Sequence, residues 1–290
     1  MLIHAEEDAA RAAATSGVVI RTLDEVADLE AVRRLYERIW RTGAAAPPVT
    51  ADLLKAMAKA GSYVSGAYAG DELVGACFGF FAAPARHALH SHIAGVLTSS
   101  RARHVGYALK LHQRAWALAH DTAEISWTYD PLIRRNAWFN LGKLAADADE
   151  YLPNFYGPID DQVNRSDDTD RILVRWSLTT DAVRAACAGS PRTLDGGAER
   201  HAGAQVALEA SAAGGPLQRP VLGRTVLVGV PDDIEGLREH DPRTAAQWRT
   251  ALREVLGGLL ADGARVRGFD RAGWYVVDRE PATDGRSRER

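Results

Sequence analysis

The sequence has little cysteine and no long apolar run, and both absences limit what the protein can be. Only two cysteines occur among the 290 residues, Cys77 and Cys187, and neither belongs to a C-x-x-C pair. Two cysteines are too few for a disulfide framework, so we expect a reducing, cytoplasmic setting. No stretch of about 18 apolar residues is present, and acidic residues interrupt the N-terminus where a secretion signal needs an apolar core. The sequence therefore predicts neither a membrane segment nor secretion.

An excess of positive charge is missing as well. The formal net charge is -3, and the 35 lysines and arginines are spread along the chain. A protein with this balance has no general attraction for a polyanion, so nucleic acid is not an expected partner. The 46% hydrophobic and 25% charged residues are instead typical of a globular protein, and the length fits one domain plus a partial second.

Apolar spacing predicts an α/β layer over residues 17–184. A strand at 18–23 is followed by two helices, capped by Asp24 and Thr50, and then by a pair of strands. The block 90–144 predicts a strand, a basic turn that opens a helix, a second strand and a second helix. With two closing strands, the order β-α-α-β-β-β-α-β-α-β-β predicts a mixed sheet with helices.

Composition divides the rest of the chain into four segments. Residues 1–16 are Ala-rich and charged, which predicts a frayed helix or a disordered lead. Residues 185–219 are rich in Ala, Gly, Ser and Pro, and we expect a mobile linker or a long excursion there. Residues 220–280 predict a strand, a helix pair and a hairpin, a small C-terminal α/β segment packed on the first domain. Residues 281–290 are polar and predict a loose tail.

The basic turn from Arg101 to Gly106 lies between an apolar strand and an amphipathic helix. A helix start presents unpaired backbone N–H groups and the positive end of the helix dipole, and both suit a diphosphate. Arg101 and Arg103 would add charge-assisted donors. The alternative is a plain strand-to-helix turn with solvated arginines.

Residues 17–179 resemble the GNAT superfamily of N-acetyltransferases, whose acyl-CoA loop, Q/R-x-x-G-x-G/A, follows the fourth strand. Arg101 takes the first place and Gly106 the last, whereas His104 stands where the middle glycine is expected. The frame that starts at Arg103 also fits. The resemblance implies an α+β fold with a mixed, mostly antiparallel sheet flanked by helices. It also implies acyl-CoA, either acetyl-CoA or succinyl-CoA, as cosubstrate, and no metal.

The resemblance also implies where the cosubstrate lies. A backbone N–H near Gly95, Val96 or Leu97 is expected to stabilise the oxyanion, and Asn136 is expected to touch pantetheine. His104 either crowds the pyrophosphate or contacts it through its imidazole. The residues expected to bind acyl-CoA are Val96, Arg101, Arg103, His104, Val105, Gly106, Tyr107, Asn136 and Phe139.

Four segments resemble one subgroup of that superfamily more specifically. They are LHSH at 89–92, WTYDPL at 127–132, NAWFNLGKL at 136–144 and YLPNFYG at 151–157. Members of the subgroup are associated with N-acylation of small amines, and some with succinyl-CoA-dependent acylation of D-amino acids. The resemblance therefore implies a small amine, such as an amino acid, as the acceptor.

Acyl transfer from a thioester to an amine needs a neutral amine, an oxyanion donor and a proton for the thiolate. His90 and His92 are two residues apart and share one face of a strand, and His92 is the expected proton relay. A structural role for both is the alternative. With His87 they form H-x-x-H-x-H, which suggests zinc, but no acidic or cysteine ligand follows at the usual spacing.

The acid is harder to assign, because Leu141 stands where many superfamily members carry a tyrosine. Tyr156 is the expected substitute and Tyr129 the second candidate, with packing as the alternative for each. Asp130 reads as a turn residue that caps the following helix. The candidates for binding a substrate carboxylate are Arg134, Arg135 and Lys143.

The leading hypothesis is an acyl-CoA-dependent N-acyltransferase that works by direct attack of the amine. No serine or cysteine lies in a recognisable nucleophile elbow or triad. A non-catalytic acyl-CoA-binding or regulatory module is the alternative, suggested by His104 and Leu141, and a metal-dependent hydrolase built on the three histidines is a third. Unpaired sheet edges in this fold often support dimers, so a homodimer is the assembly to look for.

Overall fold

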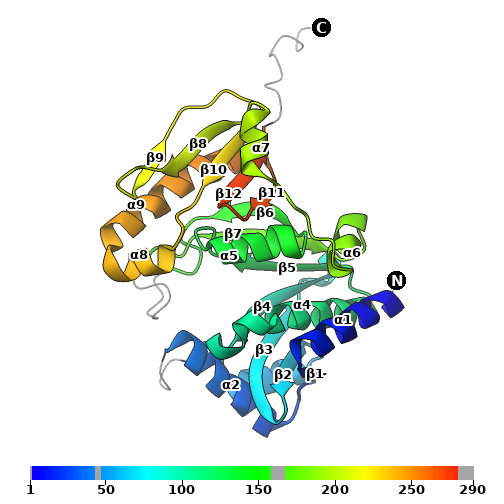
Figure 1. Cartoon of the computed structure of the whole chain (residues 1–290). Coiled ribbons are helices and arrows are strands. Elements are labelled where there is room, and N and C mark those ends of the chain that lie inside the picture. Colours follow the sequence, from blue (N-terminus) through cyan, green and yellow to red (C-terminus); the bar gives the residue numbers. More distant parts are fainter. Residues whose placement is uncertain (1, 43–46, 158–166, 280–290) are drawn as a thin grey trace. The chain divides into compact units, whose positions relative to one another are not determined.

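The computed structural model describes residues 2–42, 47–157 and 167–279, which form two sheets and their helices (Figure 1). The chain divides into two compact units. Among the described residues, unit 1 holds 2–42, 47–128 and 174–191, and unit 2 holds 129–157, 167–173 and 192–279. The units divide after residue 128, not at the boundary expected after 184. The expected tail, 281–290, lies outside the described residues.

The order of strands and helices predicted for residues 17–184 is confirmed. These elements are β1 (Val19–Thr22), α2 (Val26–Trp40), α3 (Ala51–Lys59), β2 (Tyr63–Ala69), β3 (Glu72–Phe81), β4 (Ala88–Val96), α4 (Val105–Ala119), β5 (Glu124–Tyr129), α5 (Arg134–Ala137), β6 (Asp147–Leu152) and β7 (Arg171–Ser177). The strand order is β1-β2-β3-β4-β5-β7-β6, with β1 to β4 antiparallel and β4 parallel to β5. The predicted α+β class, with a mixed and mostly antiparallel sheet, is therefore confirmed.

Helix α2 shows why this layer forms. Its buried residues Leu29, Val32, Leu35 and Tyr36 recur at helical spacing and join the core built on β2 and β3. The N-cap is Glu25, without a side-chain capping bond, so the prediction that Asp24 caps this helix was wrong by one residue. The N-cap of α3 is Thr50, as predicted, although its side chain makes no capping bond.

Residues 2–16 are not the frayed or disordered lead that was expected for 1–16. They form α1 (Leu2–Ser16), which packs along α4 (Figure 1). Asp8 on its buried face pairs with Arg114 of α4, with Nη1 and Oδ2 at 3.3 Å. Arg114 also donates to the carbonyl oxygen of Leu178 at 3.1 and 3.2 Å. The sequence did not predict a packed helix here, because alanine gives a weak apolar pattern and the ion-pair partner of Asp8 lies far along the chain.

The second sheet lies in unit 2, in the order β11-β12-β10-β8-β9. Its elements are α7 (Gly196–His201), β8 (Gln205–Ala210), β9 (Pro216–Gln218), β10 (Thr225–Gly229), α8 (Ile234–His240), α9 (Pro242–Leu252), α10 (Gly258–Ala261), β11 (Arg265–Asp270) and β12 (Trp274–Asp278), with a π-helix η4 (Arg253–Gly257) before α10. The strand, helices and hairpin predicted for 220–280 are present.

The prediction of a linker at 185–219 was wrong, because this segment holds helices and strands. It holds the end of α6 (Asp181–Cys187), α7, β8 and β9, and β8 pairs with β10 as a parallel strand. Leu208 of β8 is completely buried. The apolar alternation of β8 is short and is flanked by alanines and glycines. The composition of the segment therefore indicated a linker instead of a strand.

A buried ion-pair cluster lies in unit 2. Arg249 of α9 donates to both carboxylate oxygens of Asp130 at 3.0 and 2.9 Å, and Arg238 of α8 donates to Asp130 Oδ2 at 2.5 Å. Both arginines also donate to Asp167 Oδ2 at 2.9 Å. Burial alone would raise the pKa of Asp130, but the two guanidinium groups outweigh it and hold that pKa well below its usual range. Asp130 also accepts from the Leu132 N–H at 3.0 Å, the predicted turn role. The N-cap of α5 is Ile133, however, so the prediction that Asp130 caps this helix was wrong.

Candidate functional site

Strands β4 and β5 pair over only part of β4. Their parallel register joins Ala88 to Glu124 and ends where His90 meets Ser126. Within the described residues β4 continues to Val96 without further pairing to β5. We call the segment Ser91–Val96, together with Trp127 and Thr128 of β5, the fork. A strand edge without a neighbouring strand presents its backbone N–H and C=O groups to a ligand.

A β-bulge lies where the fork begins. Phe78 of β3 pairs with Ile93 and Gly79 pairs with Ser91, so His92 is an extra residue in β4. A bulge bends its strand and re-aims the groups beyond it.

Beyond the bulge, the pairing with β3 determines where the backbone of β4 points. The N–H of Leu97 donates to Val74 at 2.9 Å, on the β3 side. Because N–H groups alternate between the two edges of a strand, the N–H of Val96 points to the other edge, into the fork. Of the three backbone donors considered for the oxyanion, Leu97 is thus occupied, and the role of Val96 stays a prediction.

His90 and His92 lie on one face with Phe80 beside both. The Phe80 ring centroid is 5.3 Å from that of His90 and 5.8 Å from that of His92, and the two imidazoles are 6.2 Å apart. Desolvation, followed by the nearby His92 and Lys110, lowers the pKa of His90 to about 4, and desolvation also lowers the pKa of His92. Both shifts favour the neutral ring, which is the form that can accept a proton.

The zinc hypothesis finds no set of ligands within the described residues. His87 is exposed and caps the short helix η1 (Pro84–Arg86), ahead of β4. No group of three or more His, Cys, Asp or Glu side chains that could hold a metal ion occurs in the described ranges.

The turn before α4 has a left-handed residue at the helix start. The short helix η2 (Thr98–Arg103), which includes Arg101, leads into His104, the N-cap of α4, with a φ of 62°. This conformation favours glycine and is tolerated by histidine, which fits a glycine in the resembling motif. Two residues on, a Cβ built at Gly106 would meet only Val96 Cγ2, at 3.7 Å. Gly106 therefore leaves open space beside Val96.

Two side chains that were predicted to contact acyl-CoA donate hydrogen bonds to backbone carbonyl groups of this chain. Arg103 donates from Nη2 to the carbonyl oxygen of Gly17 at 2.9 Å. The hydroxyl of Tyr107 donates to the carbonyl oxygen of Ala186 at 2.9 Å. Val105 is fully buried as the first residue of α4. In this arrangement the backbone of the turn is better placed to hold an anion than these side chains are.

The sequence reasoning missed Lys110, which is buried beneath the fork. Its Nζ donates to Ser91 Oγ at 2.8 Å and to Gln113 Oε1 at 3.1 Å, and it lies 3.8 Å from the centre of the Trp127 ring. Ser91 Oγ is in turn 3.7 Å from Cys77 Sγ. Burial lowers the pKa of Lys110 to about 8. The available signal was a lysine on the apolar face of an otherwise amphipathic helix.

The remaining predicted site residues belong to unit 2. Asn136 in α5 and Phe139 in the π-helix η3 (Trp138–Lys143) are half-buried, and Leu141 is buried. Tyr156 is exposed, and its backbone N–H donates to Thr169 Oγ1 at 3.0 Å. The Arg171 guanidinium carbon lies 5.4 Å from the Tyr156 ring centre. The proposed acid role of Tyr156 stays a prediction.

Tyr129, the second candidate for the acid, is a core residue of unit 2. Its hydroxyl is 3.2 Å from that of Tyr275, which donates to the carbonyl oxygen of Pro131 at 2.7 Å. Desolvation raises the pKa of Tyr129 well above its usual range. This environment matches the packing alternative.

The cations considered for a substrate carboxylate are engaged in unit 2. Arg134 pairs with Asp232 at 2.8 Å, and Arg135 donates to Glu235 at 2.8 Å. They line a cavity of about 430 Å³ together with Trp138 and Arg271. Burial, and then Arg271, lowers the pKa of Lys143. A role for these residues in binding a carboxylate stays a prediction.

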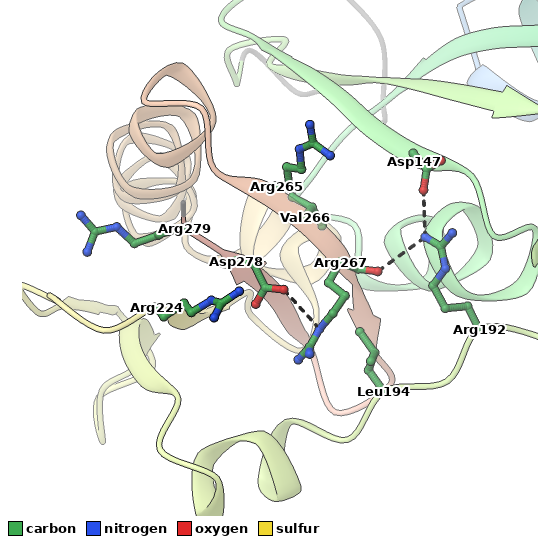
Figure 2. A pocket seen from close by; sticks show the side chains of 9 residues that line it. All are labelled: Asp147, Arg192, Leu194, Arg224, Arg265, Val266, Arg267, Asp278 and Arg279. Carbon is green, nitrogen blue, oxygen red and sulfur yellow. Dashed lines mark hydrogen bonds and ion pairs between the residues drawn. The ribbon is translucent and has the colours of Figure 1, made fainter. Parts of the chain in front are cut away.

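A larger cavity of unit 2, about 680 Å³, is lined mainly by arginines (Figure 2). Arg192 donates to Asp147 at 3.1 Å and to the carbonyl oxygen of Arg267 at 3.5 Å, as the dashed lines show. Arg267 also pairs with Glu199 at 2.5 Å. The sequence analysis assigned none of these residues to a site.

Comparisons with known proteins complete the description. No protein-family model matches the sequence, and no curated protein matches it. None of the described helices is long and apolar enough to cross a membrane.

Several solved structures are similar in fold. An N-acetyltransferase from Staphylococcus aureus Mu50 has 16% identity and a TM-score of 0.47, with 56% of this chain and 99% of that one covered. A putative acetyltransferase from Salmonella typhimurium, solved with its cofactor acetyl-CoA, has 15% identity and a TM-score of 0.46. The match covers 57% of this chain and 96% of that one. The ribosomal-protein-S18-alanine N-acetyltransferase from Escherichia coli has 13% identity and a TM-score of 0.44. The match covers 56% of this chain and 95% of that one. At these identities the likeness concerns the fold alone.

Proposed function

We propose that the protein is an acyl-CoA-dependent N-acyltransferase that moves an acetyl or succinyl group to the amine of a small molecule such as an amino acid. The observation that carries the proposal is the fork, where β4 loses its parallel partner after His90. The amide-bearing pantetheine arm of CoA can hydrogen-bond to a strand edge in the way that an added strand does. The sequence resemblance to the GNAT superfamily supports the same use of this edge.

The start of α4 supports the diphosphate end of the ligand. Helix α4 follows the fork, and its first turn presents backbone N–H groups and a positive dipole end. Gly106 in that turn leaves room beside Val96, where a side chain would otherwise stand. The residues present thus fit a CoA diphosphate at the turn, with Arg101 and His104 as further candidate contacts.

The same strand supports the reaction at the acyl carbon. The neutral imidazole of His92, at the bulge, suits a relay that removes the proton of the attacking amine. The N–H of Val96, aimed into the fork, suits the oxyanion that forms on the thioester oxygen. A direct attack of this kind needs no covalent acyl-enzyme.

Binding and thiol release test the proposal together. Thermal unfolding of the protein is measured with acetyl-CoA, succinyl-CoA and free CoA, and thiol release is followed as D- and L-amino acids are added. A ligand at about 100 times its dissociation constant stabilises by about 2.7 kcal/mol, enough to raise the melting temperature by a few degrees. No shift with any CoA species would contradict the proposal.

A matched pair of variants locates the binding. Gly106→Val fills the space beside Val96 and is expected to abolish the shift caused by CoA, because the diphosphate turn is then crowded. Gly258→Val, in α10 of unit 2, also adds a side chain to a helical glycine with nothing within 4 Å. This control is expected to keep the shift in full, and an equal loss in both variants would contradict the assigned place.

A second candidate function is a non-catalytic acyl-CoA-binding module. It is favoured by Leu141, which is buried in η3 where many superfamily members carry a tyrosine acid. Stabilisation by acyl-CoA without amine-dependent thiol release would support this module over the transferase.

A further inference from the structure

Lys110 lies where the two strands of the fork separate. The last paired residues are His90 and Ser126, and the next residue on each strand contacts Lys110. On β4 this is Ser91, whose Oγ accepts from Nζ at 2.8 Å, and on β5 it is Trp127, whose ring centre lies 3.8 Å away. The ammonium group is therefore at the apex of the fork.

Among the residues that the structure describes, no carboxylate balances the charge of Lys110. Within the described ranges Lys110 makes no ion pair, and its polar partners are Ser91 and Gln113. Its side chain is 4% exposed. The Nε2 of the neighbouring Gln113 is buried and has no hydrogen-bond partner among the described residues. Buried polar groups normally have partners, so this pocket of donors is incomplete as it stands.

Packing alone does not explain a lysine at this position. An unpaired buried ammonium costs several kcal/mol of solvation, whereas a leucine or methionine would fill the same place without that cost. A buried charge kept at such a place indicates a chemical role. The role must concern the fork, because both of its strands contact the ammonium.

We propose that Lys110 is the catalytic acid that protonates the sulfur of the leaving CoA thiolate, with Ser91 as a positioning residue. This inference rests on the proposed transferase function. The amine nitrogen bonds to the acyl carbon, the carbon–sulfur bond breaks with its electron pair on sulfur, and sulfur takes a proton from Nζ. The proton that the amine gives up reaches His92 and then solvent, and neutral Lys110 regains one from solvent.

This role gives the acid that is missing at Leu141 to Lys110, in place of Tyr156, the substitute expected from the sequence. A pKa of about 8 leaves Lys110 mostly protonated at pH 7 and able to give up its proton. Ser91 Oγ accepts a hydrogen bond from Nζ and holds it in place, and Cys77 Sγ lies 3.7 Å from the same hydroxyl oxygen.

The first test is binding, not turnover. The ionisation of the thiol of bound CoA is followed by the ultraviolet absorbance of the thiolate in the wild type, in Lys110→Met and in the control Lys59→Met on the exposed side of α3. An ammonium close to the sulfur favours the thiolate, so the wild type and the control should increase the ionisation constant about tenfold or more over free CoA. Lys110→Met should show the ionisation of free CoA.

The second test is the pH profile of amine-dependent thiol release. The wild-type rate is expected to fall above pH 8, as Lys110 loses its proton. Lys110→Met should be slower by about 10²- to 10⁴-fold and lack this alkaline limb. Ser91→Ala keeps the charge and is expected to lose several-fold in rate while keeping the limb. Apo-protein melting temperatures establish that each variant is folded.

The outcomes separate this inference from the proposed function. A Lys110→Met protein with the wild-type thiol ionisation and the wild-type alkaline limb overturns the inference and leaves the transferase standing. A wild type that binds no CoA species overturns the transferase and the inference together. If Lys110→Met does not fold, loss of rate with intact CoA binding in Ser91→Ala supports the inference, and an unchanged rate opposes it.

Discussion

Buried charges are treated differently in the two units. In unit 2, Asp130 meets Arg238 and Arg249, and every one of these side chains has a partner of opposite sign. In unit 1, Lys110 is just as buried but meets a hydroxyl, an amide and an aromatic ring. The comparison indicates that the cluster of unit 2 holds structure together, while the lysine of unit 1 is kept for chemistry at the expense of stability.

Removing one member of the unit 2 cluster should have the largest effect. Arg249→Ala removes the guanidinium that pairs with both Asp130 and Asp167 and leaves these buried carboxylates with Arg238, so we expect a loss of about 3–5 kcal/mol in unfolding free energy. Urea unfolding of the purified protein measures it. Arg243→Ala, an exposed arginine on the same helix, is the control and should change the free energy by less than about 0.5 kcal/mol. Equal effects of the two variants would mean that the cluster does not contribute to the free energy of unfolding.

The pH dependence sharpens the same point. Because the pKa of Asp130 is depressed in the folded state, its stabilising contribution is present above its unfolded pKa of about 4 and is lost as the pH falls below it. We expect the wild type to lose unfolding free energy in that acid range more steeply than Arg249→Ala, which no longer holds the carboxylate charged so strongly.

Lys110 should show the opposite behaviour. Its folded pKa of about 8 lies below the unfolded value of 10.5, so the unfolded state binds more protons between these values and stability rises with pH across them. The rise amounts to about 3 kcal/mol at 1.36 kcal/mol per pKa unit. Lys110→Met should lack the rise and be more stable than the wild type at pH 7. A clear destabilisation of Lys110→Met at pH 7 would contradict the contrast between the units.

A neutral pair in unit 2 gives a smaller effect. Tyr275→Phe removes the hydroxyl that donates to the carbonyl oxygen of Pro131 and lies 3.2 Å from the hydroxyl of Tyr129. We expect a loss of about 1–2 kcal/mol in unfolding free energy, measured in urea, because a buried acceptor is left without a donor. A loss as large as that of Arg249→Ala would mean that charge is not what distinguishes the cluster.

The smallest effect is expected at the turn before α4. His104→Gly relieves a left-handed conformation, worth about 1–2 kcal/mol, but adds freedom to the unfolded chain that offsets about 0.5–1 kcal/mol. The unfolding free energy should therefore change by about 1 kcal/mol or less, so CoA affinity can be compared directly between the two proteins by calorimetry. Tighter binding by the variant would mean that the imidazole crowds the diphosphate, and weaker binding that it contributes a contact.

The order of strands and helices could be predicted because it depends on local spacing. Leu29, Val32 and Leu35 mark α2 without reference to any other segment. Strand β8 could not be predicted in the same way, because only its partner β10 shows that its short apolar run lies inside a sheet. Helix α1 depends likewise on Arg114, which lies more than a hundred residues beyond Asp8.

The candidate site could be predicted only in part. Spacing placed His90 and His92 on one face, and their rings lie together beside Phe80. The fork itself follows from which residues of β4 pair with β5, and Lys110 gains its importance from contacts with both strands. Such facts belong to tertiary pairing, which no single-sequence pattern reports.

The bulge at His92 concentrates the extra length of β4 in one residue. If His92 were deleted, Ser91 and Ile93 would become adjacent and would still pair with Gly79 and Phe78, so β4 would match β3 residue for residue. Every position from Ile93 onward would keep its face and its edge, with Val96 still opposite Gly75. The bend that a bulge gives its strand would be lost, together with the imidazole beside Phe80. The deletion would therefore alter the path of β4 through the fork without changing its register with β3.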